Sequence, residues 1–138
     1  MKDIMLKITG RVLDGENEVE PMEFITEGRY YSRGGITRIV YEESELSGME
    51  GCQTFITFSG GKVKMNRKCP GRKSETQMEF EAGKRYEGLY ETPYGPIGME
   101  LLTNSISMDG RKLSIDYDLS LRGLLESRNS LDIEILEN

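Results

Sequence analysis

Histidine and tryptophan are absent from this chain of 138 residues, and it contains only two cysteines. The absence of histidine excludes Ser-His-Asp and Cys-His catalytic arrangements and histidine-ligated haem. A zinc site would have only carboxylates and the two cysteines as ligands, and the acidic residues form no calcium-loop motif. Glu42, Glu43, Glu45 and Glu91 could still pair as acid and base or hold a hard cation through oxygen ligands. Residue type without converging geometry is thin evidence, so we expect no catalytic residue, no metal site and no cofactor, and we predict that the protein is not an enzyme.

Long hydrophobic runs are also absent. No stretch approaches the roughly 18 apolar residues of a membrane span, and residues 1–12 alternate apolar with polar side chains, unlike a signal peptide. We expect a cytoplasmic protein with no membrane partner. In such a reducing compartment Cys52 and Cys69 are expected to be free thiols, and a single disulfide between them is the alternative.

The net charge of −6, from 18 basic and 24 acidic residues, disfavours general nucleic-acid binding. The charge is unevenly distributed, because residues 62–73 contain six basic residues and no acidic one. Between positions 62 and 68 the lysines occupy even positions, while Val63 and Met65 lie between them. The simplest interpretation is a strand with a solvated basic face. The alternative is a surface that contacts an anionic partner, either RNA or an acidic second protomer.

Alternation with a period of two is the strongest positive signal in the sequence. From Leu113 to Leu121 the odd positions are apolar and the even positions are polar, and the pattern returns at Leu131, Ile133 and Ile135. This pattern is typical of half-buried antiparallel strands. It occurs more weakly through most of the chain, so we predict an all-β protein with a single domain over residues 1–138.

Turn signals divide the chain into segments of strand length. Asp14-Gly15, Gly60-Gly61 and Asp109-Gly110 suit tight hairpins, which need positive φ angles. Many short antiparallel strands without long connections favour an up-and-down barrel of about eight to ten strands, because closure removes exposed edges. A two-sheet sandwich is the alternative fold.

The apolar pattern changes phase within residues 97–108. Apolar residues occupy odd positions up to Leu101 and even positions from Leu102 onward. A regular strand could not keep both sets inside the barrel, so we predict a β-bulge or a sharp bend near Leu102 to Asn104. Two separate strands broken at Asn104 would explain the pattern equally well.

Two segments mix acids with apolar residues and supply the candidate ligand-binding residues. Alternation through residues 38–46 places Glu43 on the same face as Tyr41, although a strand that ends near Glu42 would leave the acids on a solvated rim. Residues 86–95 place Tyr86 and Tyr90 on one face, with Glu91 on the other, and ordinary core packing also explains these tyrosines. The candidate ligand-binding residues are Tyr41, Glu43, Tyr86, Tyr90 and Glu91.

Four segments are distinctive in combination, namely residues 41–51, residues 80–85, residues 90–95 and the late strand at 113–121. Together they resemble the YwiB-like family of small bacterial proteins, and the resemblance spans nearly the whole chain. The resemblance implies a calycin-like, lipocalin-like barrel in the bacterial cytoplasm, without an established activity. The expected Thr-rich strand after Gly51 is diluted to Gln53-Thr54-Phe55-Ile56-Thr57, and residues 69–74 are more basic than the family pattern.

Two hypotheses of function follow. The first is a non-enzymatic barrel that binds a small molecule inside or at its mouth, where tyrosines and a few carboxylates would orient the ligand. The second is a protein-interaction module or homodimer that acts through its outer surface, with the basic hairpin at residues 62–73 on an anionic partner.

Overall fold

The computed structural model describes residues 2–14, 17–44, 50–71, 76–92, 95–122 and 125–136. Within these ranges the chain forms ten β-strands in a single antiparallel sheet, and no helix is long and apolar enough to cross a membrane. In chain order the strands are β1 (Lys2–Asp14), β2 (Asn17–Arg33), β3 (Ile36–Glu42), β4 (Gln53–Ser59), β5 (Lys62–Lys68), β6 (Thr76–Glu81), β7 (Arg85–Thr92), β8 (Gly95–Asp109), β9 (Lys112–Leu121) and β10 (Leu125–Leu136).

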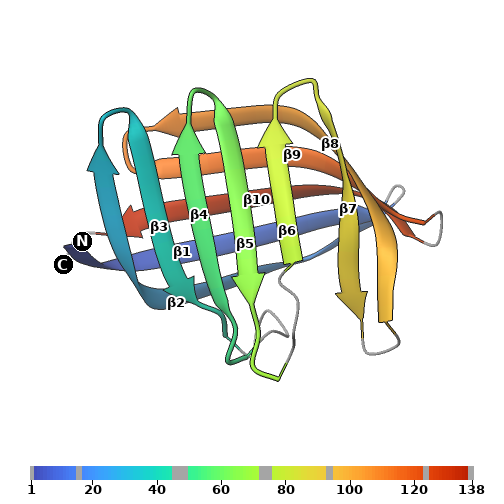
Figure 1. Cartoon of the computed structure of the whole chain (residues 1–138), viewed down its shortest axis with the longest axis horizontal. Coiled ribbons are helices and arrows are strands. Elements are labelled where there is room, and N and C mark those ends of the chain that lie inside the picture. Colours follow the sequence, from blue (N-terminus) through green and yellow to red (C-terminus); the bar gives the residue numbers. More distant parts are fainter. Residues whose placement is uncertain are drawn as a thin grey trace.

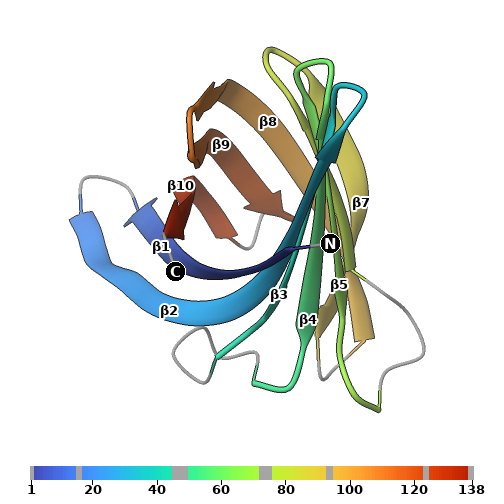
Figure 2. The ribbon, with the colours of Figure 1, turned by 90° about the vertical axis from the view of Figure 1, so that its left-hand side faces the viewer.

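The strands form a meander that curls into a nearly closed barrel. Their order in the sheet is β6-β5-β4-β3-β2-β1-β10-β9-β8-β7. The first and last strands of the chain, β1 and β10, therefore pair with each other. In Figure 1, β3 to β6 form a front layer, and β1, β8, β9 and β10 cross behind it. Figure 2 shows how β1 and β2 curve from one layer to the other. The predicted antiparallel barrel of about eight to ten strands is confirmed.

Glycine in the left-handed region makes two of the predicted tight turns. Gly60 and Gly61 have φ angles of 58° and 78° between β4 and β5, and Gly110 has 59° between β8 and β9. Side chains disfavour these angles, so glycine lets each strand fold back directly on its neighbour.

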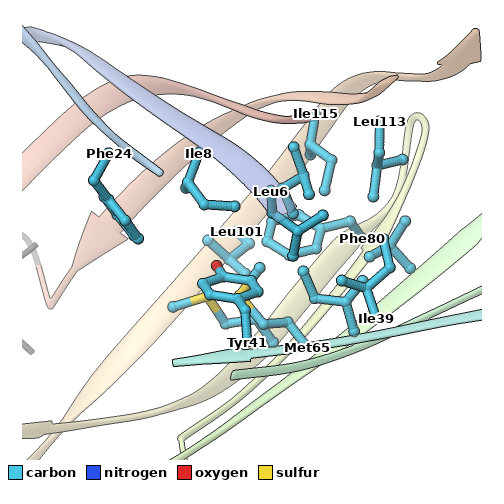
Figure 3. Packing of buried hydrophobic residues seen from close by; sticks show 14 of the residues in the cluster. Leu6, Ile8, Phe24, Ile39, Tyr41, Met65, Phe80, Leu101, Leu113 and Ile115 are labelled. Atoms are coloured by element: carbon cyan, nitrogen blue, oxygen red, sulfur yellow. The ribbon is translucent and has the colours of Figure 1, made fainter. Parts of the chain in front are cut away.

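The core is built from alternate residues of the strands. Leu113 and Ile115 are buried, as their alternation predicts, and they pack with Leu6, Phe80 and Leu101 in a single cluster (Figure 3). Val63 and Met65 are also buried, while Lys64 between them is exposed. The predicted outward direction of the lysines in β5 is therefore confirmed.

The predicted irregularity near Leu102 to Asn104 is a β-bulge. Thr103 pairs with Tyr117 and Ser105 pairs with Asp116, so Asn104 is an extra residue in β8. The Asn104 side chain donates a hydrogen bond from Nδ2 to Oδ1 of Asp116 at 3.0 Å. The bulge changes the phase of β8, which lets both Leu101 and Ile106 face the interior.

The barrel is incomplete between β6 and β7, which are the two edge strands of the sheet. The turn between them is hydrogen-bonded to β8: Gly83 N donates to Thr103 O at 2.9 Å, and Thr103 N donates to Lys84 O at 3.2 Å. From this turn β6 and β7 diverge toward the lower end of the barrel (Figure 1).

The expectation of free thiols is wrong in this structure, because Cys52 and Cys69 form a disulfide. Gln53 and Lys68 are the last pair of the β4–β5 ladder, so the residues just outside that pair face each other. Their Cα atoms are 4.2 Å apart. The antiparallel register thus brings together two cysteines that are 17 positions apart in sequence.

Candidate functional site

Polar side chains enter the interior near the lower end of the barrel, where β3, β5 and β7 end in Figure 1. Tyr41 of β3 lies opposite Thr54 of β4, which lies opposite Arg67 of β5. All three share the face of the buried residues Ile39, Ile56 and Met65, so the alternation that builds the core also turns them inward.

Glu43 completes this polar group. The β3 ladder ends at Glu42, but the Glu43 amide still donates to the carbonyl of Cys52 at 2.9 Å, which keeps the chain extended beside β4. Glu43 is only 7% exposed. The alternative of a solvated acidic rim is therefore wrong for Glu43, whereas Glu42 is exposed and accepts a hydrogen bond from Gln53 at 2.8 Å.

Hydrogen bonds connect the four side chains into a network. Thr54 donates from Oγ1 to Oε1 of Glu43 at 2.9 Å and accepts from Arg67 Nε at 3.3 Å. Arg67 Nη2 lies 3.6 Å from the same Glu43 oxygen and 3.9 Å from the sulfur of Met65. The buried carboxylate is therefore both paired with a cation and hydrogen-bonded, as a buried charge must be.

Tyr41 is 2% exposed and lies in the core cluster with Leu6, Met65 and Leu101 (Figure 3). Burial raises the pKa of the Tyr41 phenol well above its usual value, and the adjacent Glu43 charge raises it further. The Tyr41 hydroxyl donates a hydrogen bond to Glu43. At neutral pH Tyr41 is therefore a neutral donor that stabilises the carboxylate.

The tyrosines of β7 face inward along the open edge of the barrel. Tyr86 and Tyr90 are half-buried and pack against the core, while Leu89 between them is 60% exposed. The Tyr86 ring covers Gly88, where an added Cβ would lie only 2.9 Å from the ring. Burial and the nearby Glu79 raise the pKa of Tyr86.

A second polar row crosses β8, β9 and β10. Tyr117 pairs with Thr103 on one side and with Asn129 on the other, and Asn129 Nδ2 lies 3.5 Å from the Tyr117 hydroxyl. Burial raises the pKa of Tyr117, while the hydrogen bond from Asn129 and the positive charge of Arg67 lower it. The Thr103 hydroxyl is buried and has no hydrogen-bond partner within the described part of the chain.

The structure brings together some of the predicted site residues. Tyr41 and Glu43 interact directly, and Tyr90 packs partly buried against the core cluster that contains Tyr41. Tyr86 lies farther along β7, beside Glu79. Glu91 is in β7 and pairs with Pro96, but its side chain lies outside the described part of the structure. The role of all five residues in ligand binding stays a prediction.

Three polar residues of this group, Thr54, Arg67 and Tyr117, were not among the predicted site residues. Arg67 has the same parity as Val63 and Met65, so the alternation that predicts a buried face of β5 also turns Arg67 inward. Tyr117 belongs to the clearly alternating strand 113–121, and the alternation predicts a buried ring there but carries no signal for a partner of its hydroxyl.

The described residues contain no group of three or more His, Cys, Asp or Glu that could hold a metal ion. A hollow of about 570 Å³ lies on the outer face of β7 to β10, lined by leucines and charged residues that include Arg85 and Arg128. Both arginines are paired, Arg85 with Glu100 and Arg128 with Asp116 at 3.1 Å. The Arg128 hydrogen bonds hold the pKa of Asp116 below its usual value. Because these charges already satisfy one another, this hollow is a weaker candidate than the interior group.

Comparison with known proteins assigns the chain to a family. The fold is similar to the crystal structure of YwiB protein from Bacillus subtilis, with a TM-score of 0.71 and 21% sequence identity over 97% of this chain and 92% of that chain. No curated protein matches the sequence. The resemblance to the YwiB-like family is confirmed. The family model described as a domain of unknown function (DUF1934) matches residues 6–133, and the chain therefore belongs to this family.

Proposed function

We propose that the protein is a cytoplasmic, non-enzymatic binding protein that holds a small polar molecule at the lower end of its barrel. The observation that carries the proposal is the state of Arg67. Its side chain is 13% exposed, and its contacts with Glu43, Thr54 and Met65 use Nε and Nη2. Among the described residues Nη1 has no acceptor, so its two N–H groups are available to an acceptor oxygen of a ligand.

The neighbouring side chains suit a small ligand with an anionic or carbonyl oxygen and a flat ring. Tyr90 and Tyr117 supply aromatic surfaces with hydroxyl groups near Arg67, and Asn129 adds an amide. Binding sites for small molecules combine such aromatic walls with a few polar groups. The site belongs at the end of the barrel, because Phe80, Leu101 and Val63 fill the interior and are each 0% exposed.

The same geometry favours binding over catalysis. The Glu43 carboxylate already accepts hydrogen bonds from Thr54 and Tyr41 and pairs with Arg67, so it interacts with protein groups instead of a substrate. A general base must reach the proton that it abstracts, and Glu43 is almost completely buried.

Native mass spectrometry of freshly purified protein, compared with the denatured mass, tests the proposal. We expect the native species to carry an additional small mass that denaturation releases. Benzoate, which combines a carboxylate with a flat ring, serves as an added probe in two-dimensional NMR. We expect its binding to shift the Arg67 and Tyr117 resonances and to weaken in Tyr90→Phe, but not in the outer-face control Tyr31→Phe. A bare polypeptide mass together with unshifted spectra would refute the proposal.

A further inference from the structure

The outer side of β2 to β5, away from the proposed ligand site, carries a concentration of basic side chains. In the sheet Tyr31, Arg38, Thr57 and Lys64 form one row across the four strands. The adjacent row on the same face contains Arg33, Ile36, Ser59 and Lys62. We define the basic face by its six cationic residues, which are Arg29, Arg33, Arg38, Lys62, Lys64 and Lys68.

The register explains why these residues share one side. Ile39, Ile56 and Met65 form the row next to Arg38, Thr57 and Lys64 and are buried, so the residues that flank them on each strand point outward. The basic hairpin seen in the sequence is therefore only part of the feature. Three arginines that are distant in sequence join it, because β2 and β3 lie beside β4 and β5 (Figure 1).

Few acids neutralise this face. In the described parts of β2 to β5 between Arg29 and Lys68, Glu42 is the acidic residue on the outer side, and it accepts a hydrogen bond from Gln53. Lys62 pairs with Glu79 of β6 at 3.1 Å. Arg33, Arg38 and Lys64 are exposed and form no ion pair with any described residue. Arg38 and Lys64 are two strands apart, which places their backbones roughly 10 Å from each other.

Exposed apolar and aromatic surface accompanies the cations. Tyr31 is 37% exposed next to Arg38, and Ile36 is 38% exposed next to Arg33. Lys68 lies over the ring of Phe55, 5.1 Å from its centre. Tyr31 is thus an exposed aromatic ring beside cations, and unpaired bases stack on such rings while their phosphates meet Lys and Arg.

We propose that the basic face binds a short stretch of single-stranded nucleic acid, with phosphates on Arg33, Arg38 and Lys64 and a base stacked on Tyr31. The net charge of −6 argued against nucleic acid only as an average over the whole chain. Acidic residues flank the face at Glu23 and Glu27 of β2 and at Glu79 and Glu81 of β6, so the contact is confined to a narrow track. A single strand fits such a track better than a duplex, whose phosphates would extend over the acids.

Fluorescence anisotropy with a labelled oligouridylate of about 12 nucleotides tests this inference across a salt series. The logarithm of the affinity falls with the logarithm of the salt concentration, and for a single strand each lost phosphate contact should make this negative slope shallower by about 0.7. We expect this loss in Arg38→Ala and in Lys64→Ala, and about twice the loss in the double variant. Tyr31→Ala should weaken binding by about 5-fold or more, because stacking is lost.

Lys112→Ala, on the outer face of β9, is the matched control and should leave binding unchanged. All substituted residues are exposed, and unchanged circular dichroism spectra will confirm that the variants fold. A labelled polyglutamate peptide of similar length is the second probe. Two outcomes would overturn the inference: no oligouridylate binding at about 50 mM salt, or stronger binding of polyglutamate without any effect of Tyr31→Ala, which would assign the face to an acidic protein.

Discussion

At the scale of single residues, Tyr41 makes the fold sensitive to high pH. Its phenol is buried and donates to Glu43, so ionising it would place two negative charges side by side in the interior. The Arg67 charge opposes this effect but does not cancel it, because burial is the larger cause of the raised pKa. The protonated form of Tyr41 is therefore part of the native structure.

Stability should fall as the pH rises above about 10, the pKa of tyrosine in an unfolded chain. Above this pH the unfolded state releases the Tyr41 proton while the folded state retains it. The contribution of Tyr41 to the free energy of unfolding is therefore complete below about pH 10 and is lost as the pH rises further. Each such phenol adds a slope of up to about 1.4 kcal/mol per pH unit. Urea unfolding between neutral and alkaline pH should show a shallower decline for Tyr41→Phe and an unaltered one for Tyr31→Phe. An identical decline in Tyr41→Phe would show that Tyr41 ionises freely.

Alternation predicts which side of a strand a residue occupies, but not which partners it meets there. It placed Glu43 beside Tyr41 correctly, because both sit on the buried face of β3 and its extension. It did not reveal Arg67 as the partner of Glu43, since that pairing depends on the β3–β4–β5 register. The half-buried positions of Tyr86 and Tyr90 follow from alternation in the same way, whereas their distances from Glu43 depend on how the barrel curls.

At the scale of the elements, the disulfide fastens the end of the β4–β5 hairpin directly beside the buried ion pair. Cys69 follows Arg67 by two residues, and the carbonyl of Cys52 accepts the hydrogen bond from Glu43. The disulfide therefore restrains the strand ends that carry Thr54 and Arg67. Without the disulfide, only the last β4–β5 ladder pairs and the Arg67–Glu43 ion pair would restrain Thr54 and Arg67.

Reduction should lower the free energy of unfolding by about 3 kcal/mol, because the disulfide closes a loop of 17 residues in the unfolded chain. Urea unfolding with and without dithiothreitol will measure the difference. The double variant Cys52→Ser with Cys69→Ser should match the reduced protein and should not respond to the reductant. Equal midpoints for the oxidised and reduced wild-type protein would contradict a stabilising role for the disulfide.

The bulge in β8 was predictable and the disulfide was not, for physical reasons. The apolar pattern changes from odd to even positions between Leu101 and Ile106, which requires an extra residue wherever both sides stay buried, so the sequence contains the signal for Asn104. Cysteine pairing depends on register and on the redox compartment, and the reasoning from a reducing compartment favoured free thiols at Cys52 and Cys69.

At the scale of the whole molecule, the barrel is closed by β1 and β10 and opened between β6 and β7. Neither feature has a local signal. Thr76–Glu81 and Arg85–Thr92 both alternate as ordinary strands joined by a short turn, which would normally predict a paired hairpin. The Gly83 amide donates to the Thr103 carbonyl and the Thr103 amide donates to the Lys84 carbonyl, which draws the turn toward β8 and leaves β6 and β7 as the two edges of the sheet.

This opening predicts uneven protection of backbone amides from hydrogen exchange. β9 is paired on both sides, so its amides should exchange only through large-scale opening of the barrel. In β7, the amides that point away from β8 lack a ladder partner and should exchange much faster, in alternation along the strand. Hydrogen exchange followed by two-dimensional NMR will distinguish the two patterns, with β1 as a second doubly paired control. Uniform protection along β7 would mean that β6 and β7 pair in solution. That result would close the barrel beside Tyr86 and Tyr90 and remove the open edge from the proposed ligand site.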